Sequence, residues 1–213
     1  MKMMDYINDF SNHLKEALNI ADKTVLQKNG KEFTNVLIIG LGGSGIGGTI
    51  VKDIIAPDCS VPVLSTKNYD LPDFVSDKTL VIVSSYSGNT EETISALKKC
   101  IVKGCEIAII TSGGKLKSIA KKQNYNHIVI PGGNPPRAMF GYSFTVLFKL
   151  LKHYNIIDFD WQKDFNDAIC LLEKEQKQIK KEANNLADKL HGKTPVIYAA
   201  DGFEGVAVRF RQQ

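Results

Sequence analysis

Five short apolar segments that alternate with helical stretches are the feature that most restricts how this chain can fold. They lie at residues 36–39, 61–64, 80–84, 106–111 and 127–130. Short apolar runs bounded by turn residues are typical of buried strands. Their alternation with helices predicts an α/β fold, a doubly wound parallel sheet of five strands flanked by helices. Because crossovers are right-handed, the loops that follow the strands meet at one edge of the sheet, where ligands bind.

A hydroxyl-rich segment, SSYSGNTEET at residues 84–93, follows the third predicted strand and leads into a predicted helix at 91–103. The free N–H groups and the positive dipole end of that helix point back into the segment. Gly88 allows a close approach of the backbone to a ligand. These features predict a cradle for a phosphate monoester that is held by neutral donors. The alternative is a capped helix, with Ser87 or Thr90 as the N-cap residue.

A glycine-rich loop at residues 40–48 follows the first predicted strand and leads into a predicted helix at 46–55. Gly40, Gly42 and Gly45 formally match the dinucleotide-binding pattern, so an NAD-dependent dehydrogenase is an alternative. Such an enzyme needs an acidic residue about 20 positions later, at the end of the next strand. That strand is followed by STK, and Asp70 comes late. We therefore favour one anion that is shared by the two loops.

Composition narrows the possible functions. The 213 residues carry 27 basic and 23 acidic side chains without a basic stripe, so we expect no nucleic-acid partner. The sequence shows neither a membrane-spanning run nor a signal peptide, so we expect no membrane association. The four cysteines are scattered, and no cluster of histidine, cysteine and carboxylate residues has metal-ligand spacing. We therefore predict a cytoplasmic protein with reduced thiols and without a metal or other cofactor.

Three motifs in a fixed order resemble a known family. They are GGSG at 42–45, SYSGNTEET at 85–93, and PGG at 131–133 followed by PRA at 136–138. They look like the first sugar isomerase (SIS) domain of the bifunctional phosphoglucose/phosphomannose isomerases, and the resemblance runs from about residue 35 to residue 213. It implies a flavodoxin-like SIS fold and a hexose 6-phosphate substrate. It also implies a catalytic Arg137 and a set of phosphate-binding residues, Gly43, Ser44, Ser85, Ser87 and Thr90.

The resemblance places Arg137 over C1 and C2 of the open-chain sugar. Interconversion of glucose or mannose 6-phosphate with fructose 6-phosphate passes through an enediolate, in which negative charge builds up on oxygen. A fixed guanidinium beside that oxygen stabilises the transition state more than the ground state. The alternative is a surface or capping arginine at the start of a predicted helix at 138–154, where a cation is unfavourable to the helix dipole.

Helical periodicity predicts two further helices, at residues 4–27 and 164–191. The second could cross between domains or join a dimer seam, but fewer than four heptads with a polar seam position favour packing within the chain. We divide the chain into an N-terminal helix (1–34), a first, phosphosugar-binding SIS domain (35–155), a connecting helix (156–193) and the start of a second SIS domain (194–213). We expect a homodimer.

The C-terminal segment resembles the opening of a second SIS domain. Residues 195–200 predict a buried strand, 201–202 a turn and 204–213 a helix. In the resembled family a glutamate base, a ring-opening histidine and a lysine come later, and no residue of this chain matches them. We therefore expect a fragment that binds hexose 6-phosphates but isomerises them negligibly. The alternative is a non-catalytic phosphosugar-binding SIS module, as in transcriptional regulators, although their DNA-binding helix-turn-helix is missing.

Overall fold

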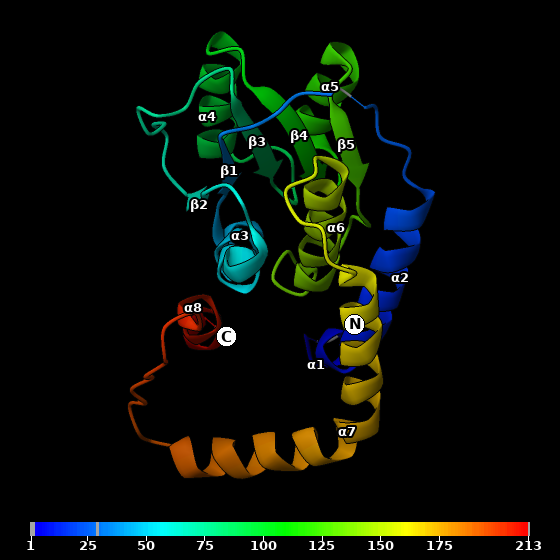
Figure 1. Ribbon diagram of the computed structural model, residues 1–213. Helices are drawn as coiled ribbons and strands as arrows, with labels where there is room; N and C mark the ends of the chain where they lie inside the picture. Colours follow the sequence, from blue (N-terminus) through cyan, green and yellow to red (C-terminus); the bar gives the residue numbers. More distant parts are fainter. Residues whose placement is uncertain (1–2, 29, 213) are drawn as a thin grey trace.

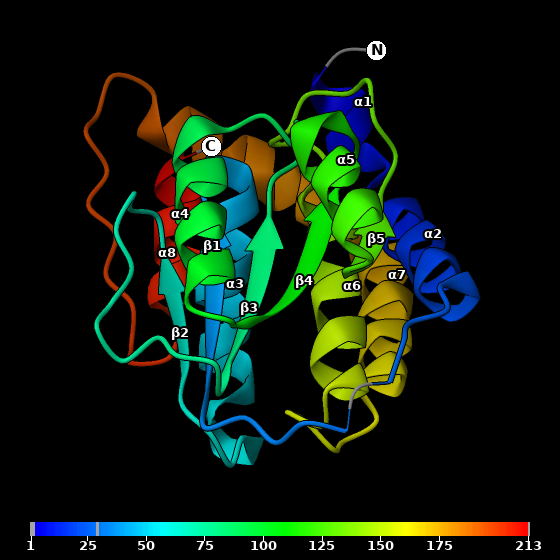
Figure 2. The same cartoon turned by 90° about the horizontal axis from the view of Figure 1, so that it is seen from above.

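A five-stranded parallel sheet forms the centre of the molecule (Figure 1) in the computed structural model, which describes residues 3–28 and 30–212. The strand order is β2-β1-β3-β4-β5, and the strands run side by side in Figure 2. The strands are β1 (Asn35–Gly40), β2 (Val63–Thr66), β3 (Thr79–Ser84), β4 (Glu106–Thr111) and β5 (Asn126–Val129). All five predicted strands are confirmed, β4 with its predicted bounds and the others with shifted ends.

Helices cover both faces of the sheet, as expected for a doubly wound fold. They are α3 (Gly42–Ile55), α4 (Glu91–Val102), α5 (Gly114–Gln123) and α6 (Phe140–His153), and a short 3-10 helix, η1 (Ala56–Asp58), follows α3. Successive strand residues point to opposite faces. Leu37 and Val81 therefore join the apolar core under α4 and α5. Ile38 and Ile82 join the core under α3 and α6, which explains why the strands are apolar at every position.

The N-terminal helix is not continuous, so the prediction of one helix over 4–27 is wrong. The structure has α1 (Met3–Asn8) and α2 (Phe10–Lys23), separated at Asp9. The side chain of Asp9 accepts a hydrogen bond from Asn12 Nδ2 at 2.6 Å. Short polar side chains compete in this way for local hydrogen bonds and favour helix ends over helix interiors.

The long helix α7 (Trp161–Leu190) buries side chains in the core only at its beginning. Trp161, Phe165 and Ile169 are buried in the core, whereas Ile179 is 46% exposed. Figure 1 shows the second half of α7 extending beyond the other helices. Packing within the chain therefore accounts for the first turns, and the outer turns carry exposed apolar side chains.

The predicted strand at 195–200 is wrong. Residues 195–200 have no regular secondary structure, and Val196 and Tyr198 are 71% and 91% exposed. A strand requires a neighbouring strand that pairs with its N–H and C=O groups, and no described strand pairs with this segment. The helix after it is present as α8 (Glu204–Gln212), which folds back onto α3, where Gly205 lies against Ile50.

Candidate active site

Four loops meet at the carboxyl edge of the sheet because each follows a parallel strand. We call them the glycine loop (residues 40–45, after β1), the serine loop (84–90, after β3), the β4 loop (111–114) and the arginine loop (131–139, after β5). Ligands of open α/β sheets bind at this edge. All the site residues predicted from the sequence lie in the glycine, serine and arginine loops.

The serine loop has a conformation that only glycine permits at its turn. Gly88 has a φ of +66°, and a Cβ atom there would overlap the carbonyl oxygen of Gly113. Its hydroxyls bond within the loop: Ser85 and Thr90 share a hydrogen bond of 2.8 Å, and Ser87 Oγ accepts from the N–H of Asn89 at 3.2 Å. The loop is therefore pressed against the β4 loop with its hydroxyl groups gathered together.

Thr90 is the N-cap residue of α4 by position, as one alternative predicted, but it does not cap the helix with its side chain. Its hydroxyl is shared with Ser85 rather than with the helix backbone of the described residues. The N–H groups of the first turn of a helix have no partner inside that helix. The start of α4 therefore presents backbone donors toward the serine loop, as an anion site requires.

The glycine loop is shorter than predicted because α3 begins at Gly42 instead of residue 46. A Cβ atom on Gly45 would overlap the carbonyl oxygen of Gly40, so glycine here allows the strand-to-helix turn to close tightly. A Cβ atom on Gly43 would lie 3.3 Å from the carbonyl oxygen of Pro136. The loop thus approaches the arginine loop closely, which a larger side chain would hinder.

Tyr86 connects all four loops. Its N–H donates to Ser44 Oγ at 3.1 Å, and its carbonyl oxygen accepts from the N–H of Ser112 at 3.0 Å. Its phenol oxygen accepts from the N–H of Asn134 at 3.1 Å. No motif in the sequence predicts a role for Tyr86 itself, although Tyr86 lies within the hydroxyl-rich segment at residues 84–93.

Residues from three loops line one hollow of about 430 Å³. Gly43, Thr90 and Arg137 are in its wall, together with Met3, Leu41, Gly42, Pro135 and Pro136. Ser85 is joined to this wall by its hydrogen bond to Thr90, and Ser44 directly follows Gly43 in the chain. The structure therefore brings Gly43, Thr90 and Arg137 to one hollow, whereas Ser44, Ser85 and Ser87 are not among the residues of its wall.

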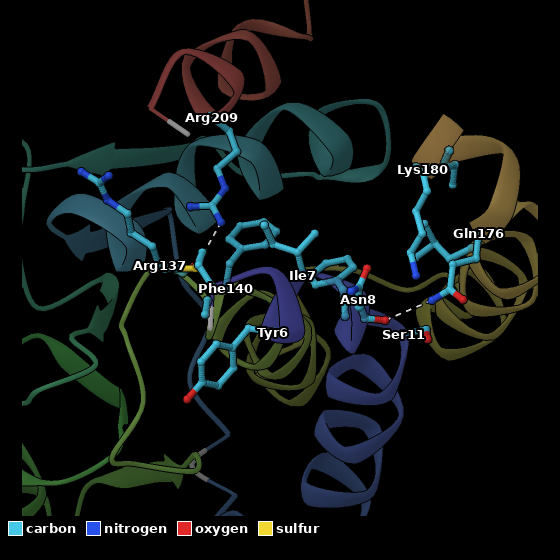
Figure 3. A pocket seen from close by; sticks show the side chains of 14 residues that line it. Tyr6, Ile7, Asn8, Ser11, Arg137, Phe140, Gln176, Lys180 and Arg209 are labelled. Atoms are coloured by element: carbon cyan, nitrogen blue, oxygen red, sulfur yellow. Dashed lines mark hydrogen bonds between the residues drawn. The ribbon is translucent and has the colours of Figure 1, made fainter. Parts of the chain in front are cut away.

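Arg137 precedes α6, which begins at Phe140 rather than at residue 138, and its side chain is exposed. Its Nη1 donates to the carbonyl oxygen of Gln212 at 3.2 Å, and its own carbonyl oxygen accepts from Arg209 Nη2 at 2.8 Å. Arg209 also lies over the ring of Phe140, 4.8 Å from its centre (Figure 3). Burial, and next the neighbouring charge of Arg137, lower the pKa of Arg209.

Arg209 was missed by the sequence analysis. It lies 72 positions from its partner Arg137, and no local pattern predicts a contact at that separation.

Within the described ranges, every helix is too short or too polar to cross a bilayer. The described residues also contain no group of three or more histidine, cysteine, aspartate or glutamate side chains that could hold a metal ion.

The parallel sheet, flanked by helices and with these loops at its edge, defines an SIS fold. The C-terminal domain of glucosamine-fructose-6-phosphate aminotransferase from Francisella tularensis superposes with a TM-score of 0.77 at 16% identity, covering 99% of this chain and 65% of that one. At this identity the similarity establishes the fold alone. Residues 179–213 match the family model described as the bacterial phospho-glucose isomerase C-terminal SIS domain.

Sequence comparison finds relatives that share one name. The bifunctional phosphoglucose/phosphomannose isomerase of Caldicellulosiruptor bescii is 37% identical over 218 aligned residues, which cover 99% of this chain and 64% of that protein. The protein of the same name from Thermoplasma volcanium is 36% identical, over 93% of this chain and 62% of its own length. Over most of its length, this chain is a homologue of the bifunctional phosphoglucose/phosphomannose isomerases. It spans less than two thirds of the length of these two relatives.

Proposed function

We propose that the chain is the phosphate-binding part of an aldose–ketose isomerase that converts glucose 6-phosphate and mannose 6-phosphate to fructose 6-phosphate. The observation that carries this proposal is the hollow whose wall contains Gly43, Thr90 and Arg137. The names of the relatives support it.

The phosphate would be held by the glycine and serine loops. Ser44, Ser85, Ser87 and Thr90 supply hydroxyl donors, and the start of α4 supplies backbone N–H groups and the positive end of its dipole. Hydrogen bonds to a charged acceptor are stronger than those between neutral groups. Because Ser85 and Thr90 now share one hydrogen bond, their hydroxyl protons would turn toward the phosphate when it binds.

Arg137 would act at the other end of the sugar. Its guanidinium stabilises the oxygen that becomes negatively charged in the enediolate. Because C2 is planar in this intermediate, the same intermediate can return to glucose or mannose phosphate. We place the proton-shuttling base outside the 213 residues, since the glutamate, histidine and lysine that the resemblance implies match no position here.

The proposed division of the chain follows from this role. Residues 1–34 are an N-terminal helical segment, 35–155 the first SIS domain, 156–193 the connection and 194–213 the beginning of the second SIS domain. The match of residues 179–213 to the C-terminal SIS model supports a second SIS domain at the end of the chain, but this match begins at residue 179, inside the proposed connection. We further propose a cytoplasmic homodimer, with the exposed outer turns of α7 as its first candidate interface.

Thermal melting with ligands tests the binding proposal. A ligand that binds only the folded state raises the melting temperature by mass action. Glucose 6-phosphate should raise it, whereas glucose and NAD should not. Equal shifts with glucose, or a shift with NAD alone, would contradict the proposal. A non-catalytic SIS module would show the same shifts. An isomerase assay on a longer chain that includes the expected glutamate, histidine and lysine separates the two functions, because only the isomerase would be active.

A further inference from the structure

Arg209 of α8 and Arg137 of the arginine loop each donate a hydrogen bond to a backbone carbonyl oxygen in the other's segment. Arg209 Nη2 donates to the carbonyl oxygen of Arg137 at 2.8 Å, and Arg137 Nη1 donates to the carbonyl oxygen of Gln212 at 3.2 Å. Building on the proposed role of Arg137, we propose that Arg209 is a positioning residue that fixes the direction of the Arg137 guanidinium.

Contacts at both ends of its side chain hold Arg209 in place, so that it can position Arg137. Its guanidinium lies over Phe140, and the Phe140 ring stacks on Phe144 with 5.0 Å between the ring centres. The backbone of α8 is fixed on α3 because Gly205 lies against Ile50; a Cβ atom on Gly205 would come within 2.8 Å of Ile50 Cγ1. Both ends of the Arg209 side chain are therefore anchored on the first domain.

The Arg137 side chain needs a positioning contact because it lies between two cavities. It lines the 430 Å³ hollow that contains Gly43 and Thr90. It also lines a second cavity of about 450 Å³, between α1, α6, α7 and α8. Tyr6 and Lys180 line this cavity too (Figure 3). An exposed arginine has many rotamers. A bond to its carbonyl oxygen limits the backbone direction from which the side chain starts.

Arg209 carries an electrostatic cost that docking of α8 alone does not require. Arg209 Nη1 is buried and has no hydrogen-bond partner among the described residues. Burial, and next the charge of Arg137, also lower the pKa of Arg209. Burying a polar or charged group without all of its hydrogen-bond partners costs free energy. Negative charge that develops beside Arg137 would relieve the repulsion between the two guanidinium groups.

Calorimetric titration of the 213-residue chain with two ligands tests the inference. One is glucose 6-phosphate, and the other is a hydroxamate of a five-carbon phosphosugar acid, which imitates the planar enediolate. Arg209→Gln should weaken binding of the hydroxamate by about tenfold or more, because a misdirected Arg137 loses its hydrogen bond to this charged group. It should weaken glucose 6-phosphate binding much less, because the phosphate contacts stay intact.

Matched variants make the result specific. Arg211→Gln is the control, since Arg211 is an exposed arginine of the same helix without a hydrogen bond or ion pair to the described residues. In an Arg137→Ala background, Arg209→Gln should cause no further loss, because the two residues act as a unit. If Arg209→Gln does not fold, Arg209→Lys keeps the charge and should cause a smaller loss of hydroxamate binding.

The outcomes separate this inference from the proposed function. If the unaltered chain binds neither ligand, the proposed function fails and the role of Arg209 fails with it. If the unaltered chain binds both and Arg209→Gln weakens them equally, Arg209 is only structural and the inference is overturned. A loss of hydroxamate binding that persists in the Arg137→Ala background also overturns it.

Discussion

The phenol oxygen of Tyr86 accepts the backbone N–H of Asn134 at 3.1 Å and so joins the serine loop to the arginine loop. Asn134 is also held by Tyr6 of α1, whose hydroxyl donates to Asn134 Oδ1 at 3.0 Å. The segment that carries Arg137 is therefore tied down from two sides just before the arginine. The phosphate end and the arginine end of the proposed site cannot move independently.

Tyr86→Phe should lower the free energy of unfolding by about 1–3 kcal/mol, because the partly buried N–H of Asn134 loses its acceptor. Urea denaturation measures this change. Tyr198→Phe is the control, since Tyr198 is 91% exposed and should change stability very little. Equal effects of the two substitutions would show that the bond between Tyr86 and Asn134 contributes nothing.

Gly88→Ala should destabilise the chain more than Gly133→Ala. Both glycines have a positive φ, +66° and +81°, so alanine is strained at either position by roughly 1–2 kcal/mol. At Gly133 a Cβ atom would meet open space, whereas at Gly88 it would overlap the carbonyl oxygen of Gly113. Urea denaturation of both variants isolates the steric contribution. A loss at Gly88 no larger than at Gly133 would contradict the close contact between the serine and β4 loops.

Ser87→Ala should weaken binding of glucose 6-phosphate by about tenfold or more, because one hydrogen bond to a charged group, worth roughly 1.5–3 kcal/mol, is removed. Ser87 is exposed, so its loss should change the melting temperature of the free chain very little. Ser118→Ala on α5 is the matched control, an exposed serine far from the predicted phosphate loops in the sequence. Unchanged affinity after Ser87→Ala would remove Ser87 from the phosphate site.

The segment between α7 and α8 should be the first site of proteolysis. Lys193 is exposed, and the residues after it have no regular structure. Trypsin should cut after Lys193 faster than within α7 if the segment stays unpaired. If a second copy of the chain pairs with it, the cut should slow as protein concentration rises, and light scattering should show a dimer. A monomer that is cut rapidly at all concentrations would contradict the homodimer.

The 213-residue chain should isomerise hexose 6-phosphates negligibly. Proton transfer by a positioned base contributes typically about 10² to 10⁴-fold to such reactions, and no residue of the chain matches the expected base. A coupled isomerase assay with chelator present measures the activity, and a longer chain with the missing glutamate, histidine and lysine should be active. Turnover by the 213-residue chain that disappears in Arg137→Ala would place a base inside it, and Glu204 would be the first candidate.

Local patterns sufficed for the sheet and for the grouping of its loops. The run at residues 106–111 is apolar because β4 is buried on both faces, and its bounds follow directly from that run. Parallel strands with right-handed crossovers bring their following loops to one edge, so the order of the motifs was enough to place Gly43, Thr90 and Arg137 near one another.

Long-range contacts decided what the sequence could not. The apolar run at 195–200 has the composition of a strand, but a strand forms only where another strand offers hydrogen-bond partners, and none of the described strands does. The bond between Arg209 and Arg137 joins residues 72 positions apart. Strand propensity is a property of neighbouring residues, whereas pairing and side-chain contact depend on which distant segments the folded chain brings together.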